Sequence, residues 1–103
     1  MRSRADLQHL LEDIMYCDDG EVYFQPPEKF RIKYPCIIYK LRDYDPVYAD
    51  NKAYLLHKRY QMLLIHRDPD NKIKDKLARL PMCTFERFYT ADNLNHYVFN
   101  IYY

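Results

Sequence analysis

The C-terminal stretch T-A-D-N-L-N-H-Y-V-F-N-I-Y-Y, residues Thr90–Tyr103, decides the fold of this chain. From Leu94 onward polar and apolar positions alternate, and this alternation is typical of a β-strand with one buried face. A second run rich in Thr, Phe and Tyr, Thr84–Tyr89, precedes it, and the polar residues Thr90–Asn93 between the runs suit a turn. We therefore predict a C-terminal hairpin whose last strand buries Tyr97, Phe99, Ile101 and Tyr103.

The N-terminal segment has the pattern of an amphipathic helix. Ser3 followed three residues later by Asp6 resembles a capping box. The helix should end near Tyr16 or Cys17, and the only glycine of the chain, Gly20, is expected to supply a turn residue of positive φ. The apolar residues that recur at i, i+3, i+4, i+7 and i+8 are Leu7, Leu10, Leu11, Ile14 and Met15.

Three further strands are expected in the middle of the chain. Glu21–Gln25 is a short β-prone run that two prolines terminate, and Cys36–Leu41 is a second run of the same kind. Lys52–His66 is apolar on both alternating faces, which indicates the central strand of the sheet. A helix is the alternative for this last run, because Met, Leu, Lys and Gln favour helices.

The segment Asp43–Asn51, D-Y-D-P-V-Y-A-D-N, is predicted to be a long loop because Asp, Asn and Pro favour turns. Loops of this length are frequently functional, so we expect it to contact a partner. Its polar residues lack the alternating spacing, central glycine and terminal glutamate of a calcium loop, and no metal site is expected. These residues are Asp43, Asp45, Asp50 and Asn51.

A second, shorter helix is predicted after Asp68-Pro69, which has the sequence of an N-cap followed by a first helical residue. Ile73, Leu77 and Leu80 then repeat at helical spacing until a proline follows. The predicted order is therefore α-β-β-β-α-β-β. It defines a single α+β domain spanning residues 1–103, with about five mostly antiparallel strands and both helices packed against them.

The composition restricts the possible partners. The 103 residues carry a formal charge of +1, which argues against a dedicated surface for nucleic acid or for an anionic membrane. The cysteines Cys17, Cys36 and Cys83 are odd in number and widely spaced, which fits neither a disulfide framework nor a zinc site. With no apolar leader or membrane-length run, we expect a soluble chain in a reducing cytoplasm.

The twelve tyrosines favour either oligomerisation or a two-sided sheet.

No motif for catalysis is present in the sequence. A single serine and a single glycine cannot build a nucleophile elbow or a phosphate-binding loop, and the four histidines have no metal-ligand spacing. Carboxylate pairs could be drawn from Asp18, Asp19 and Glu21, or from Glu86 and Asp92, but such pairs arise by chance. We expect neither an enzyme nor a bound cofactor. A platform for single-stranded nucleic acid that uses Arg59, Arg87 and the tyrosines remains an alternative.

Four motifs from Tyr34 onward resemble one family, the tail completion or tail terminator proteins of long-tailed bacteriophages. The most specific part is D-N-L-N-H, Asp92–His96, followed by alternating aromatic residues. The N-terminal helix agrees with the family in type only. The motifs are Y-P-C-I-I-Y-K-L (Tyr34–Leu41), Y-A-D-N-K-A-Y (Tyr48–Tyr54), K-R-Y-Q-M (Lys58–Met62) and F-E-R-F-Y-T-A-D-N-L-N-H-Y-V-F (Phe85–Phe99).

The resemblance implies a structural protein of the virion tail or neck that assembles in the bacterial host cytoplasm. Such proteins form a ring, commonly of six copies, that stops growth of the tail tube and contributes to joining the tail to the head. The implied partners are further copies of the chain, the tail tube protein and the head–tail connector proteins, with no membrane and no specific nucleic acid. The alternative is a head-closure or stopper protein, which is a component of the head–tail connector. By position, the Asp43–Lys52 loop and the Thr90–Asn95 turn are expected to make these contacts, and ordinary turn chemistry is the alternative role for their residues. The expected interface residues are Arg42, Asp50, Asn51, Arg59, Asp92 and Asn93.

Overall fold

The computed structural model describes residues 4–27, 31–49 and 52–103, with the side chains of residues 44–49 and 52–57 excepted. Its five strands form one sheet in the order β1-β2-β3-β5-β4, in which β1 and β2 are parallel and all other neighbours are antiparallel. The α+β fold and the order α-β-β-β-α-β-β are confirmed. The elements are α1 (Arg4–Met15), the short 3-10 helix η1 (Tyr16–Asp18), β1 (Glu21–Phe24), β2 (Cys36–Ala49), β3 (Lys52–His66), α2 (Ile73–Ala78), β4 (Cys83–Ala91) and β5 (Leu94–Tyr102).

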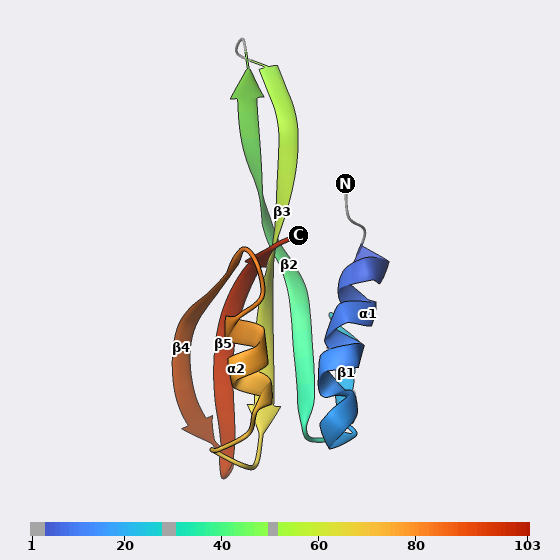
Figure 1. The fold of residues 1–103 in the computed structure, drawn as a ribbon, viewed down its shortest axis with the longest axis vertical. Coiled ribbons are helices and arrows are strands. Elements are labelled where there is room, and N and C mark those ends of the chain that lie inside the picture. Colours follow the sequence, from blue (N-terminus) through green and yellow to red (C-terminus); the bar gives the residue numbers. More distant parts are fainter. Residues whose placement is uncertain (1–3, 28–30, 50–51) are drawn as a thin grey trace.

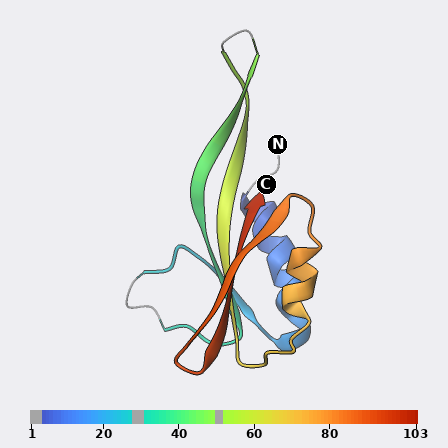
Figure 2. The same cartoon turned by 90° about the vertical axis from the view of Figure 1, so that its left-hand side faces the viewer.

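Both helices lie on the same face of the sheet (Figure 1). Figure 2 views the sheet from its β4 edge, with the helices on one side and the connection between β1 and β2 on the other. The face without helices is called the open face below. α1 ends at Met15, within one residue of the predicted end, and Ser3, the predicted capping residue, lies outside the described residues.

The core lies between the two helices and the sheet. The predicted apolar faces of β3 and β5 are confirmed, because Met62, Leu64, Phe99 and Ile101 are almost completely buried. Burying each of these side chains contributes roughly 1.5–3 kcal/mol to folding. The helices complete the core with Leu7, Leu11, Met15, Ile73 and Leu77, which are fully buried.

The prediction that Asp43–Asn51 forms a loop is wrong. β2 continues to Ala49 and pairs with β3 along its length, for example Tyr44 with Lys58 and Val47 with Leu55. Pairing with the next strand of the chain, β3, overrides these turn signals, because it satisfies the backbone hydrogen-bonding groups of both strands. The predicted contact residues Asp50 and Asn51 lie outside the described residues.

Beyond the body of the molecule, β2 and β3 form a two-stranded projection (Figures 1 and 2). β1 pairs with β2 only as far as Tyr39, and β5 pairs with β3 only as far as Arg59. Residues 43–49 and 52–58 are called the arm. The arm gives the molecule its long axis, since the extents are 50 × 29 × 24 Å.

The start of α2 differs from the prediction. Asp68-Pro69 does not cap it, because the Asp68 carboxylate accepts a hydrogen bond from the backbone N–H of Asp70 at 2.9 Å and holds a turn. The helix begins at Ile73, and the side-chain oxygen of Asn71 accepts from the backbone N–H of Lys74 at 3.0 Å. Asn71 therefore performs the capping role that the sequence assigned to Asp68.

The predicted C-terminal hairpin is confirmed. β4 and β5 pair from Cys83 with Ile101 to Ala91 with Leu94. The turn residues Asp92 and Asn93 have φ of 53° and 61°. Two successive positive φ angles are the requirement of a tight type I′ hairpin turn, which Asp and Asn tolerate.

The predicted role of Gly20 is corrected by the structure. Asp19, with φ of 50°, is the left-handed residue of this turn, and Gly20 does not have a positive φ. The backbone packs closely at position 20, because a Cβ there would displace Cε of Met15 and lie 3.2 Å from the carbonyl oxygen of Pro35.

We expect Gly20→Ala to lower the free energy of unfolding by about 1–3 kcal/mol, because the added methyl displaces the buried Met15. Urea denaturation followed by circular dichroism measures the change. The neighbouring substitution Asp19→Gly is the matched control, since glycine suits a left-handed residue and should alter stability by less than about 1 kcal/mol. Equal stability of Gly20→Ala and the unsubstituted protein would contradict the packing argument.

Candidate functional site

One β-bulge lies in β2 at the base of the arm, and another lies in β4 at the edge of the sheet. The register of β2 against β3 shifts between Leu41 and Asp43, and that of β4 against β5 shifts between Phe85 and Arg87. The extra residues are Arg42 in β2 and Glu86 in β4. Because a bulge redirects a side chain relative to the regular alternation, both residues reach the open face.

Arg42 and Glu86 meet on the open face, where Asn100 of β5 joins them. Nη1 of Arg42 donates to Oε1 of Glu86 and to Oδ1 of Asn100, both at 2.8 Å, and Nδ2 of Asn100 donates to Oε1 of Glu86 at 2.9 Å. The Asn100 hydrogen bond, followed by that from Arg42, lowers the pKa of the Glu86 carboxyl below its ordinary value. The three side chains connect β2, β5 and β4 across β3.

Arg59 forms a second polar cluster beside the first. Its Nε donates to Oδ1 of Asp43 at 2.7 Å, and its Nη2 donates to Oδ2 of the same carboxylate. Nη1 donates to the hydroxyl of Tyr102 at 3.4 Å, and the guanidinium lies 5.8 Å from the centre of that ring. The Arg59 hydrogen bonds lower the pKa of Asp43, and the same pairing raises the pKa of Arg59.

The Arg59 cluster joins Asp43, the first arm residue of β2, to the body on the open face, and the Arg42 cluster lies beside it within the body. The bidentate pair links opposite strands of the arm base, and Tyr102 ties it to β5. Exposed ion pairs add little to global stability, but several that share partners restrict geometry. We expect this arrangement to restrict the direction in which the arm leaves the sheet.

The predicted interface residues fall into two groups. Arg42 and Arg59 lie together at the base of the arm, whereas Asp92 and Asn93 form the hairpin turn at the opposite end of the body (Figure 1). The remaining two, at positions 50 and 51, lie outside the described residues. A contact role for all six stays a prediction, although the turn-forming role of Asp92 and Asn93 is established by their φ angles.

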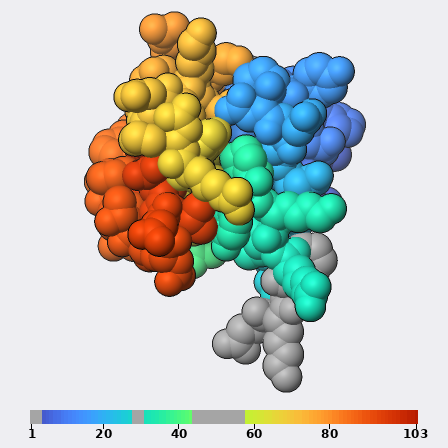
Figure 3. All heavy atoms as spheres, turned by 90° about the horizontal axis from the view of Figure 1, so that it is seen from below, coloured from blue at the N-terminus to red at the C-terminus, as the bar shows by residue number. Residues whose placement is uncertain are grey.

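The end of the body away from the arm contains a buried histidine. Nε2 of His66 lies 2.9 Å from a carboxylate oxygen of Asp18, and its Nδ1 accepts from the backbone N–H of Asp68 at 3.0 Å. Figure 3 shows this end, where the yellow segment after β3 lies beside the blue end of α1 and η1. His66 therefore joins the end of the central strand to the turn after α1.

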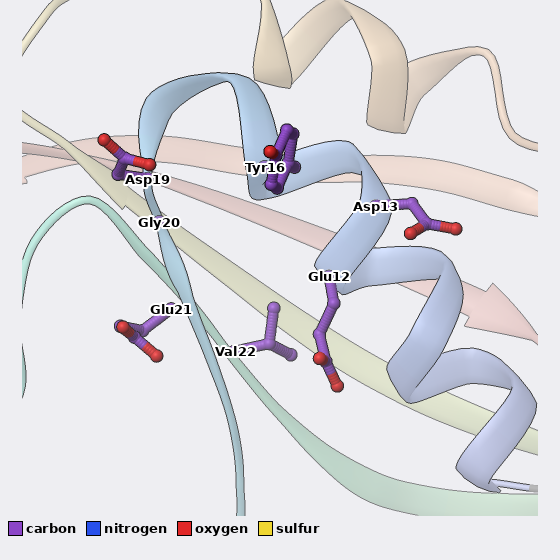
Figure 4. Close-up of a pocket in the computed structure, with 7 residues that line it drawn as sticks. All are labelled: Glu12, Asp13, Tyr16, Asp19, Gly20, Glu21 and Val22. Atoms are coloured by element: carbon purple, nitrogen blue, oxygen red, sulfur yellow. The ribbon is translucent and has the colours of Figure 1, made fainter.

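A shallow acidic pocket of about 400 Å³ lies between α1 and β1 (Figure 4). Its carboxylates point away from one another, and the described residues contain no group of three or more His, Cys, Asp or Glu side chains able to hold a metal ion. Of the carboxylates considered from the sequence, Asp18 binds His66 and Glu86 binds Arg42. The lining residues are Glu12, Asp13, Tyr16, Asp19, Gly20, Glu21 and Val22.

The cysteines are free in the structure. Burial raises the pKa of Cys36 to about 12 and that of Cys83 to about 11. A thiol with so high a pKa is a poor nucleophile at neutral pH. Cys17 is exposed and forms a weak hydrogen bond to the carbonyl of Ile14 at 3.6 Å.

No protein-family model matches this chain, and no curated protein matches it. Among the described residues, no helix combines the length and apolar character needed to cross a bilayer.

Sequence reasoning selected Arg42 and Arg59 but missed their partners. Glu86 and Asn100 come from strands far along the chain, and their meeting depends on two register shifts that no local pattern encodes. One signal was present for β4: Phe85 and Phe88 are three residues apart in a predicted strand, which breaks strict alternation and is typical of a bulge.

The carboxyl groups of Asp43 and Glu86 should titrate below their ordinary pKa values of 3.8 and 4.5. Because folding lowers both pKa values, their stabilising contribution is fully present above the ordinary values and is lost as pH falls through the folded-state values. Carboxyl-carbon NMR across an acid titration measures both midpoints.

The control is Arg59→Met, which should return the Asp43 midpoint toward its ordinary value and leave that of Glu86 nearly unchanged. An Asp43 midpoint at the ordinary value in the unsubstituted protein would contradict the described pairing.

Proposed function

We propose that this chain is a structural protein of a long-tailed bacteriophage that forms a ring at the head-proximal end of the tail tube, where it terminates tube growth and contributes to head–tail joining. The single observation that carries the proposal is the arm, whose strands extend out of the body. The arm supplements the motif resemblance, whose most specific part forms the β4–β5 turn and the start of β5.

The arm has the shape required for contact with another chain. In residues 43–49 and 52–58 the two strands pair with each other and not with β1 or β5. An isolated two-stranded ribbon is at best marginally stable in water, and its outer edges present backbone groups that another strand or surface can satisfy. A partner protein therefore supplies the missing support.

The polar clusters at the arm base suit such a role. A ring subunit must present its contact segment in one direction, so that each copy meets the tube end in the same way. The bidentate Arg59–Asp43 pair and the Arg42–Glu86–Asn100 cluster restrict this direction. In the proposed mechanism the ring caps the tube by shape, because one face fits the last tube ring and the other offers no site for a further tube subunit.

The clusters weigh against the alternative of a surface for single-stranded nucleic acid. Such a surface needs basic groups free to neutralise phosphates. Arg59 is bound to the Asp43 carboxylate and Arg42 to that of Glu86. A further basic–aromatic contact among the described residues of the open face places Arg87 5.6 Å from the centre of the Tyr89 ring, with Glu86 3.9 Å from the same guanidinium.

Deletion of the coding sequence from the genome that carries it tests the proposal. We expect tails of abnormal length that fail to join heads, seen by electron microscopy, and restoration of both features by the chain supplied from a plasmid. Normal tail length and normal joining in the deletion strain would exclude the proposed function.

The double substitution Asp92→Asn with Asn93→Gly separates the turn role of these residues from their predicted contact role. Asn-Gly is a preferred type I′ sequence, so the hairpin should be retained and the free energy of unfolding should change by no more than about 1 kcal/mol. If the turn contacts a partner, complementation of the deletion strain should fall at least tenfold. Full complementation by this variant would remove Asp92 and Asn93 from the interface.

A further inference from the structure

One lateral edge of the molecule carries an apolar groove between α2 and β4. The groove has a volume of about 190 Å³, and an apolar cavity on the order of 150 Å³ accepts a benzene ring. Beside it, β4 exposes 54% of Phe85 and 50% of Phe88, which pack against Phe99 and Tyr97. The lining residues are Lys74, Asp75, Ala78, Phe85, Tyr97 and Phe99.

The opposite lateral edge carries an exposed aromatic side chain. Tyr16, in η1 after α1, is 82% exposed and stands at the acidic pocket between α1 and β1 (Figure 4). No other large apolar side chain described in the structure is as exposed. The four carboxylates that line the pocket with it belong to Glu12, Asp13, Asp19 and Glu21.

The two edges have complementary charge. Of the acidic residues in 12–21, Asp18 binds His66 of the same copy, whereas Glu12, Asp13, Asp19 and Glu21 stand at the pocket with Tyr16. Of the basic residues in 72–79, Lys72 and Lys76 line a hollow with Asp18 of the same copy, and Lys74 and Arg79 lie outside that hollow. Lys74 lines the groove itself, where its Nζ lies 3.6 Å from Asp75 and donates to the carbonyl of Asn71. Complementary charges of this kind select an orientation and disfavour contacts between like edges.

We propose that the α2–β4 groove of one copy receives Tyr16 of a second copy, with the acidic edge of the second copy facing the basic α2 of the first. β1 and β4 occupy the two ends of the strand order, so the contact is between different surfaces of the two copies. A contact of this type repeats from copy to copy and closes into a ring when the rotation permits. The inference rests on the proposed function, for which it supplies the subunit interface.

A mixing experiment tests the contact between unlike surfaces. Tyr16→Ala removes the aromatic side chain that enters the groove of the other copy. Ala78→Arg places a large charged side chain in the groove and so blocks it. Both positions are exposed, so both variants should keep the fold and the melting temperature of the unsubstituted protein. Each variant alone should sediment as a 12.7 kDa monomer under conditions in which the unsubstituted protein associates.

An equimolar mixture of the two variants retains one intact groove and one intact Tyr16. It should therefore form a dimer of twice the monomer mass and nothing larger. Ala5→Arg, the same substitution at an exposed alanine of α1 outside both surfaces, is the matched control and should associate like the unsubstituted protein.

The proposal is overturned if the mixture stays monomeric, or if either variant associates as fully as the unsubstituted protein. These outcomes are separate from the test of the proposed function. Loss of the dimer together with defective tails in the deletion strain would reject this interface only, whereas dimer formation with normal tails in that strain would reject the function and keep the contact.

Discussion

The antiparallel pairing of β2 with β3 is the constraint on which the rest of the structure depends. It places β3 at the centre of the sheet, where it supplies Met62 and Leu64 to the core. It also continues past the body and creates the arm. One pair of strands therefore supplies the centre of the body and also the arm, which we propose contacts a partner, while the helices cover one face of the body.

The polar clusters on the open face connect the paired strands β2 and β3 with the neighbouring strands of the body. Without the bulge at Arg42, regular alternation would direct Arg42 and Asp43 to opposite faces of β2. With it, Arg42 reaches Glu86 and Asn100 while Asp43 binds Arg59. These hydrogen bonds connect β2 with β3, β4 and β5 at the arm base and beside it.

Much of the fold could be predicted from the sequence because its signals are local. The alternation in β5, the helical spacing in α1 and the doubly apolar run of β3 each follow from the side chains of one segment. The outer half of β2 could not be predicted, because its Asp and Pro residues indicate a loop, whereas continued pairing with the following strand β3 overrides that signal. The sequence identified Arg42 and Arg59 but not the carboxylates that bind them, because those contacts depend on how the strands pair across the sheet. The role of Gly20 was misassigned because it depends on the close approach of Met15 and Pro35 and not on its own φ.

The central claim is that this protein works through surfaces offered to its own copies and to the end of a tube. The most direct measurement is cryo-electron microscopy of purified particles, with mass spectrometry to establish that the chain is present. The account predicts a ring of copies at the head-proximal end of the tail tube, with the arm of each copy against a neighbouring chain. Particles that lack the chain, or that contain it as isolated copies with arms in solvent, would contradict it.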